Sequence, residues 1–89
     1  MEKGLTKRCK DAVIFAMCVH LSTRDKRYIF MKSNFKRTLY DKIDFDGEGE
    51  PLNRAIQIYE LFDKNNMLGS LIASVNSVFD TDLYIELEK

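Results

Sequence analysis

The sequence predicts an all-α domain, a compact bundle of five to six short helices. The 89 residues include only one Pro and four Gly, whereas a small β-sandwich needs a turn signal about every ten residues. Neither Gly nor Pro occurs from Leu5 to Asp46, so this half of the chain can form helices joined by short connections. Apolar residues recur every three or four positions along most of the chain, which is typical of amphipathic helices.

The chain is long enough for a single domain, residues 1–89. A chain of this size buries roughly 64% of its unfolded surface on folding, and 45% of its residues are hydrophobic. This apolar content can form one core, and it excludes a disordered chain.

The first predicted helix covers about residues 5–20. Its residues at helical spacing are Leu5, Cys9, Ala12, Val13, Ala16, Met17 and His20. Every residue from Ala12 to Val19 is apolar, so we expect the middle of this helix to be buried on most sides.

Two shorter helices are expected before the loop at 43–50. Ser22 or Thr23 can cap the second helix, which ends near Lys32 and should present three residues to the core: Tyr28, Ile29 and Met31. Ser33 and Asn34 break this helix, and a third helix at 35–42 carries Phe35, Leu39 and Tyr40.

The second half predicts two or three more helices. Pro51 suits the first turn of a fourth helix, whose apolar face comprises Leu52, Ala55, Ile56, Ile58, Tyr59, Leu61 and Phe62. Asn65 and Asn66 can adopt the left-handed conformation that ends a helix. A fifth helix then has the apolar residues Leu68, Leu71, Ile72, Val75, Val78 and Phe79. We interpret 83–88 as a sixth helix capped by residues 80–82, with an extended strand as the alternative.

The formal net charge of zero conceals an uneven distribution. Residues 1–42 contain eleven Lys or Arg against four Asp or Glu, and residues 43–89 contain three against ten. If the two halves occupy different faces, copies of the chain can associate head to tail through opposite charges. If the helices fold back on one another, the charges are instead interleaved over an ordinary solvated surface.

The two cysteines indicate a reducing compartment. On one helix, Cys9 and Cys18 would have Cα atoms about 13.5 Å apart, too far for a disulfide. A secreted domain usually pairs its cysteines, and the apolar run at 12–19 is too short to cross a bilayer. We therefore expect a cytoplasmic protein without a membrane partner.

The loop at 43–50 partly matches a calcium-binding EF-hand loop. Its acidic residues are Asp44, Asp46, Glu48 and Glu50. They fall on ligand positions one, three, five and seven, and Gly49 falls on the required sixth position, but position twelve is Ala55 rather than the bidentate Glu. An acidic turn is the expected state, and a weak Ca²⁺ site is a third hypothesis.

Nothing in the sequence predicts catalysis or a cofactor. Cys18 and His20 lie two apart on a helix and point in different directions; a buried structural thiol fits Cys18 better. Phosphate-binding Gly loops and zinc-ligand spacing are absent. The basic stretch at 24–37 is interleaved with aromatic residues, so a nucleic-acid-binding or regulatory helical module is the alternative function, although the sequence pI of about 6.6 argues against it.

Several segments together resemble a known family. The sequence Ile-Asp-Phe-Asp-Gly at 43–47 precedes the apolar helix at 52–59, a polar break leads into Leu-x-x-Leu-Ile at 68–72, and Val-Phe-Asp follows at 78–80. The stretch from Lys10 to Asp82 thereby resembles the bacterial effector-associated domain of the first type, in the death-fold-like adaptor superfamily.

The resemblance implies a non-catalytic adaptor in bacterial conflict or antiviral signalling. Such a domain binds another copy, or a related effector-associated domain carried by a STAND-type ATPase or by a caspase-like or trypsin-like peptidase. It thereby couples a sensor to an effector. The positive face of the interface is predicted to comprise Lys7, Arg8, Lys10, Arg24, Arg27, Lys36 and Arg37. The negative face is predicted to comprise Asp44, Asp46, Glu48, Glu50, Glu60 and Asp63.

Overall fold

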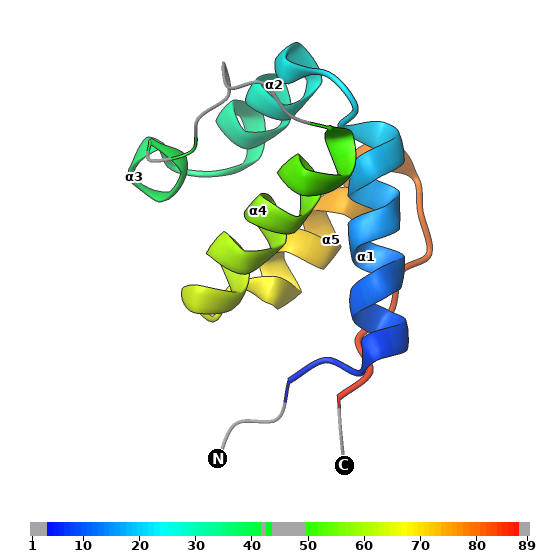
Figure 1. Cartoon of the computed structure of the whole chain (residues 1–89). Coiled ribbons are helices and arrows are strands. Elements are labelled where there is room, and N and C mark those ends of the chain that lie inside the picture. The colour runs from blue at the N-terminus through cyan, green and yellow to red at the C-terminus, as the bar shows by residue number, and fades with distance from the viewer. Residues whose placement is uncertain (1–3, 42, 44–49, 88–89) are drawn as a thin grey trace.

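The computed structural model describes residues 4–41, 43 and 50–87. In this part of the chain it contains the helices α1 (Lys7–His20), α2 (Arg24–Asn34), α3 (Arg37–Tyr40), α4 (Pro51–Lys64) and α5 (Leu68–Phe79). The predicted all-α bundle is confirmed. Figure 1 shows α1 beside α4 with α5 behind them, and α2 and α3 toward one end of the bundle. At the other end the segment before α1 meets the segment after α5, through Leu5 and Leu87.

The core lies where α1, α4 and α5 pack together. Its most deeply buried side chains are Phe62, Met17, Leu21, Met31, Ile58, Leu71, Val13 and Val75. Stacked and edge-on rings attach the α2 region: Phe30 lies 5.5 Å from Phe79, and Phe35 lies 4.7 Å from Phe62, between ring centroids. Aromatic pairs add stability beyond the area they bury, so they fix α2 on the three-helix core.

Local hydrogen bonds set the helix ends. The hydroxyl oxygens of Thr6 and Thr23 accept the backbone N–H of Cys9 and Lys26, each at 3.2 Å, so Thr23 rather than Ser22 caps α2. Helix α4 ends in a left-handed turn at Asn66 (φ 56°), whose following residue donates its N–H to the Phe62 carbonyl at 2.8 Å. The Asn65-Asn66 prediction is therefore confirmed.

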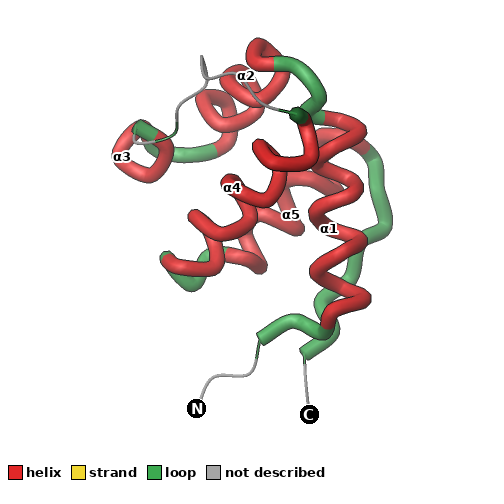
Figure 2. Tube along the Cα trace, viewed as in Figure 1, coloured by secondary structure: helices red, strands yellow, loops and turns green. Residues whose placement is uncertain are grey.

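The predicted sixth helix is wrong. Residues 81–86 form no helix, and Leu87 makes an isolated antiparallel bridge with Leu5 (Figure 2). The side-chain amide of Asn76 forms hydrogen bonds with both backbone groups of Leu83. Its Nδ2 donates to the Leu83 carbonyl and its Oδ1 accepts the Leu83 N–H, each at 2.8 Å. Thr6 N–H donates to the Glu86 carbonyl at 2.9 Å. These bonds use the groups that a helix needs, so the strand alternative was nearer the structure.

The inward face of α2 also differs from the prediction. Tyr28 and Ile29 are 38% and 60% exposed, and Arg27, Phe30 and Met31 are the buried residues. The cap at Thr23 and the packing of Phe30 on Phe79 set the rotation of this helix.

Helix α1 is less buried than its apolar run predicts, and α4 and α5 each expose one residue that was predicted for the core. Phe15 is 69% exposed and Val19 52%, and Ala12 is exposed. Leu52 and Val78, both predicted for the core, are 48% exposed. Among the described helices, none combines the length and apolar composition that crossing a membrane requires.

Candidate interaction surfaces

The predicted positive face divides into two groups at opposite ends of α1. Lys7, Arg8 and Lys10 lie on its first turns, whereas Arg24 begins α2, beyond its far end. The 14 residues of α1 place these groups about 20 Å apart. Two further cations of the predicted face, Lys36 and Arg37, lie exposed at α3. The structure therefore does not bring all of these cations together on one surface.

Arg27 does not belong to an exposed face, which corrects that part of the prediction. It is 6% exposed, and its Nη1 donates to the Leu21 carbonyl at 3.1 Å, just past the end of α1. Its Nε has no hydrogen-bond acceptor among the described residues. Burial, and then the positive charge of Arg54, lowers the pKa of Arg27. Arg27 is therefore a structural residue that joins α2 to the end of α1.

The predicted negative face is only partly described. Asp44, Asp46 and Glu48 lie outside the described residues. Glu50 precedes α4 as its N-cap, and Glu60 and Asp63 are exposed on that helix.

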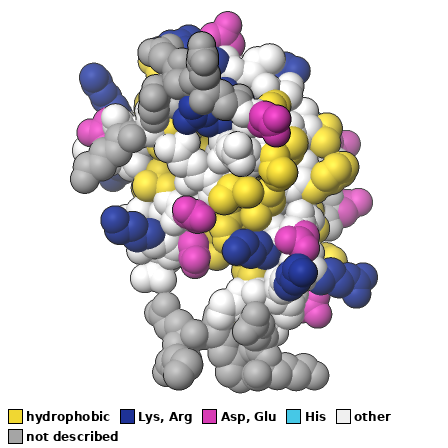
Figure 3. All heavy atoms as spheres, viewed as in Figure 1, with side chains coloured by type: hydrophobic (Ala, Val, Ile, Leu, Met, Phe, Trp, Pro, Cys, Tyr) yellow, Lys and Arg dark blue, Asp and Glu magenta, His cyan; other side chains and the backbone are white. Residues whose placement is uncertain are grey.

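Charges from the two halves of the chain meet between α1 and α4. Asp63 shares a hollow of about 430 Å³ with Lys7 and Lys10, and Asp11 also lines it. Figure 3 shows acidic and basic side chains interleaved over this face. In this region the charges are therefore interleaved rather than separated into two faces, because α1 and α4 come from opposite halves of the sequence and pack side by side.

Tyr59 forms part of the floor of the same hollow. Its side chain is buried, and the Lys10 Nζ lies 5.5 Å from the ring centroid. Burial raises the pKa of Tyr59 to about 12, with smaller contributions from Asp63 and Cys9. The phenol therefore stays neutral over the ordinary pH range and acts as a packed ring under the α1–α4 surface.

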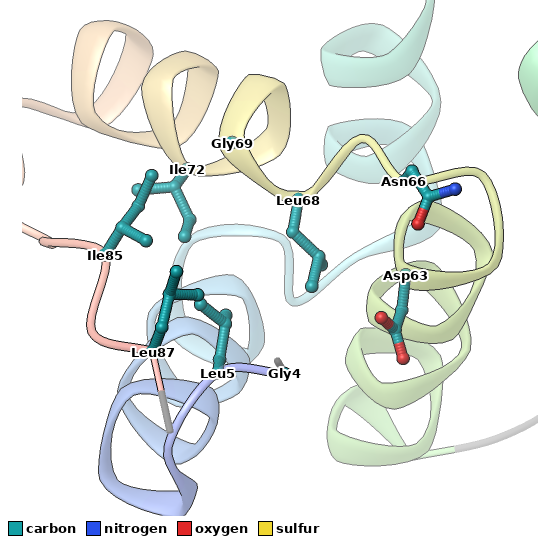
Figure 4. Close-up of a pocket in the computed structure, with 9 residues that line it drawn as sticks. All are labelled: Gly4, Leu5, Asp63, Asn66, Leu68, Gly69, Ile72, Ile85 and Leu87. Atoms are coloured by element: carbon teal, nitrogen blue, oxygen red, sulfur yellow. The ribbon is translucent and has the colours of Figure 1, made fainter. Parts of the chain in front are cut away.

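A second hollow, here called the terminal hollow, lies where the segment before α1 meets the segment after α5 (Figure 4). It has a volume of about 300 Å³ and an apolar wall formed by Leu5, Leu68, Ile72, Ile85 and Leu87. Figure 4 shows Asp63 and Asn66, from the end of α4, on the side away from Ile85 and Leu87. Ile85 and Leu87 are 54% and 53% exposed, so this wall is open to solvent.

A third hollow, here called the helix-end groove, lies at the other end of the bundle. It has a volume of about 410 Å³ and is lined by residues from α1, α2 and α5: Val19, His20, Lys26, Ile29, Phe30, Val78 and Phe79. The His20 ring stacks on Phe79 with centroids 4.7 Å apart. The single histidine is therefore part of the packing beneath the groove.

A basic hollow lies over α2 and α3, lined by Tyr28, Lys32, Arg37, Tyr40, Asp41 and Ile43. The Arg24 guanidinium and the Lys32 Nζ lie 6.0 and 5.8 Å from the Tyr28 ring centroid. In the stretch 24–37 the other rings, Phe30 and Phe35, are buried or half-buried. Tyr28 is therefore the aromatic ring of this stretch that an external base could reach.

The described residues hold no group of three or more His, Cys, Asp or Glu side chains arranged for a metal ion; the acidic part of the loop at 44–49 lies outside them. Both cysteines are free thiols, and the buried Cys9 donates to the Tyr84 carbonyl at 3.0 Å. This bond ties the C-terminal segment to α1.

The sequence did not identify Val19, Ile29, Val78, Ile85 or Leu87 as surface residues. A usable signal was present in α1, because an unbroken apolar run exceeds what one buried helix face can hold. Comparison of the chain with protein-family models, with curated proteins and with solved structures gives no match.

Proposed function

We propose that this chain is a non-catalytic adaptor domain that binds another copy of itself or a related domain. The observation that carries the proposal is the exposure of aliphatic side chains at two separate ends of the bundle. Val19, Ile29, Ile85 and Leu87 are each more than half exposed. Apolar residues gathered around a surface hollow mark protein interaction sites, whereas single exposed ones need no explanation.

The resemblance to bacterial effector-associated domains supplies the biological setting of this proposal. In that setting the chain acts in the cytoplasm and couples a sensor, such as a STAND-type ATPase, to a caspase-like or trypsin-like peptidase. The domain contributes binding alone, and the partner contributes catalysis. The exposed cations of α1, α2 and α3 and the carboxylates of α4 support this proposal, because charged rims steer partners and select among them.

Sedimentation velocity across protein concentration, at low and high salt, tests the proposal. Molar mass that rises with concentration supports self-association, and a decrease with salt identifies the charged part of the interface. The related-domain arm mixes the chain with effector-associated domains encoded by adjacent genes. A monomer at every concentration that also fails to cosediment with those domains contradicts the adaptor function.

The basic hollow favours a second candidate, a nucleic-acid-binding module. Lys32 and Arg37 line it together with the partly exposed ring of Tyr28, a combination suited to phosphate contact and base stacking. Retardation of a labelled single-stranded oligonucleotide, with affinity that falls steeply as salt rises, supports this function. Tyr28→Ala and Lys32→Ala should then each weaken binding.

A further inference from the structure

The helix-end groove and the terminal hollow are apolar surfaces with opposite charges at their rims. Lys26 is the only Lys, Arg, Asp or Glu among the described residues that line the groove. Asp63 is the only Lys, Arg, Asp or Glu among the described residues that line the terminal hollow. Neither side chain makes an ion pair with another described residue. Lys7 and Lys10 border Asp63 in the adjoining α1–α4 hollow without forming such a pair, so the Asp63 carboxylate can still pair with a cation of a partner.

The two surfaces lie at opposite ends of the molecule. Helix α5 begins with Leu68 and Gly69 at the terminal hollow and ends with Val78 and Phe79 at the helix-end groove. Its 12 residues correspond to about 18 Å of helix. The two surfaces therefore cannot belong to one contact between two copies, and each can hold a different neighbour.

We infer that the helix-end groove of one copy docks on the terminal hollow of the next, in a head-to-tail contact. The inference rests on the proposed adaptor function and identifies the surfaces that self-association uses. Lys26 and Ile29 are three residues apart on α2 and therefore share a face. In the docked pair the 60% exposed Ile29 enters the apolar hollow, and Lys26 faces Asp63.

Charge favours this pairing over the symmetric ones. Two grooves placed face to face would bring two Lys26 ammonium groups together, and two hollows placed face to face would leave both Lys26 groups without an opposite charge. Like charges across an interface are unfavourable, whereas the crossed arrangement places opposite charges together. Because the two surfaces differ and lie apart, the contact is heterologous. An assembly of docked copies therefore has a free groove at one end and a free hollow at the other.

Two single-surface variants test the inference directly by sedimentation velocity. Ile29→Asp disables the groove, and Ile85→Asp disables the hollow, so each variant alone should lose self-association by at least about tenfold. Mixed in equal amounts they should form a 1:1 dimer that does not grow, because the mixture retains one intact groove and one intact hollow. Leu52→Asp is the matched control: it is another half-exposed aliphatic residue on a helix, and it lines neither surface.

Charge reversal provides a second, independent readout with residues that are exposed. Lys26→Glu and Asp63→Lys should each weaken association, and the double variant that carries both changes should regain it. A double variant that associates no more strongly than the single ones overturns the pairing of these two residues.

The outcomes separate this inference from the adaptor proposal. If the wild-type chain associates but both Asp variants associate equally well, or if their mixture grows beyond a dimer, the surfaces assigned here are wrong while the adaptor function stands. If the wild-type chain stays monomeric at every concentration, head-to-tail self-docking is overturned. The adaptor proposal is then decided by the related-domain arm of its own experiment.

Discussion

Arg27 illustrates at the scale of one residue that burial decides what a cation does. Its sequence context matches that of the exposed cations around it, yet it is buried and bonds the Leu21 carbonyl. Burial follows from its place on the inward face of α2, three and four residues before Phe30 and Met31. Which face of α2 points inward depends on contacts with α5, and the local sequence of α2 does not determine these contacts.

Arg27→Ala is expected to lower the free energy of unfolding by about 1–3 kcal/mol, because the Leu21 carbonyl loses its donor and the buried stem loses its packing. Helix propensity does not compensate, since Ala and Arg are both good helix formers. Urea denaturation provides the measurement. Arg24→Ala is the control: the Arg24–Asp25 pair, at 3.0 Å, is exposed on both sides, so its loss should cost less than about 1 kcal/mol. Equal losses in the two variants would contradict the structural role of Arg27.

Tyr59 predicts a specific sensitivity to alkaline conditions. In the unfolded chain a tyrosine loses its proton near pH 10, whereas burial raises the pKa of Tyr59 in the folded state to about 12. Between these values the unfolded state binds fewer protons than the folded state, so the stability contribution of Tyr59 is lost as pH rises from about 10 to 12. Below pH 10 both states keep the proton and the shift has no effect.

Tyr59→Phe should therefore reduce the loss of stability that the wild-type chain undergoes between pH 9 and 11. The measurement is the difference in the free energy of unfolding between the two proteins at each pH, which cancels the titration of lysines and cysteines. Tyr84→Phe, at a 54% exposed position, serves as the reference variant. Parallel pH profiles for wild type and Tyr59→Phe would refute the effect of burial on this phenol.

At the scale of the element, periodicity identified α1, α4 and α5 because each buries one continuous face against the others. Local signals also placed several ends correctly: Thr23 at the start of α2, Pro51 in the first turn of α4 and Asn66 after its last turn. The C-terminal segment was misread because its backbone partners, Asn76, Thr6 and Leu5, come from other elements. Spacing within a six-residue segment carries no information about such partners.

Asn76→Ala tests whether this side chain keeps the C-terminal segment extended. The substitution removes three hydrogen bonds, to the Leu83 carbonyl, the Leu83 N–H and the Thr81 hydroxyl, and should lower the free energy of unfolding by about 1–3 kcal/mol. Amide exchange should accelerate at Leu83 and in the residues after it, while the α1–α4 core changes less. Ser77→Ala, an exposed change on the same turn, is the control. Unchanged exchange at Leu83 would show that other contacts hold the segment.

At the scale of the whole molecule, the described charges of the two sequence halves meet where α1 packs on α4. Helix α1 from the basic half packs on α4 from the acidic half, and Lys7 and Lys10 share a hollow with Asp63. The sequence analysis singled out Lys7, Lys10, Arg37 and Asp63, which line the described hollows, but not Lys26 or Lys32, which also line them. It also did not predict how these charges are grouped. The exposure of Ile29 and Ile85 could not be predicted, because it depends on how α2 and the C-terminal segment pack against the core.

The substitution Gly69→Ala should change both the stability of the fold and its self-association. It lies in the first turn of α5, and a Cβ at this position would meet only the Ile85 Cδ1 at 3.9 Å, an ordinary contact. Ala in place of Gly is worth about 0.5–1 kcal/mol in a helix interior. Gly69 is the second residue of α5, so Gly69→Ala should raise the free energy of unfolding by the lower end of this range. The added methyl group also occupies part of the terminal hollow, which Gly69 lines, so self-association should become weaker.

The opposite signs of these two effects make the result decisive, because a partly unfolded variant cannot be the more stable one. Thermal unfolding gives the first effect and sedimentation velocity the second. Ser70→Ala, the next residue on the exposed side of α5, should raise stability slightly through helix propensity and leave association unchanged, since it does not line the terminal hollow. If Gly69→Ala is more stable and associates as strongly as the wild type, the next copy does not enter this hollow.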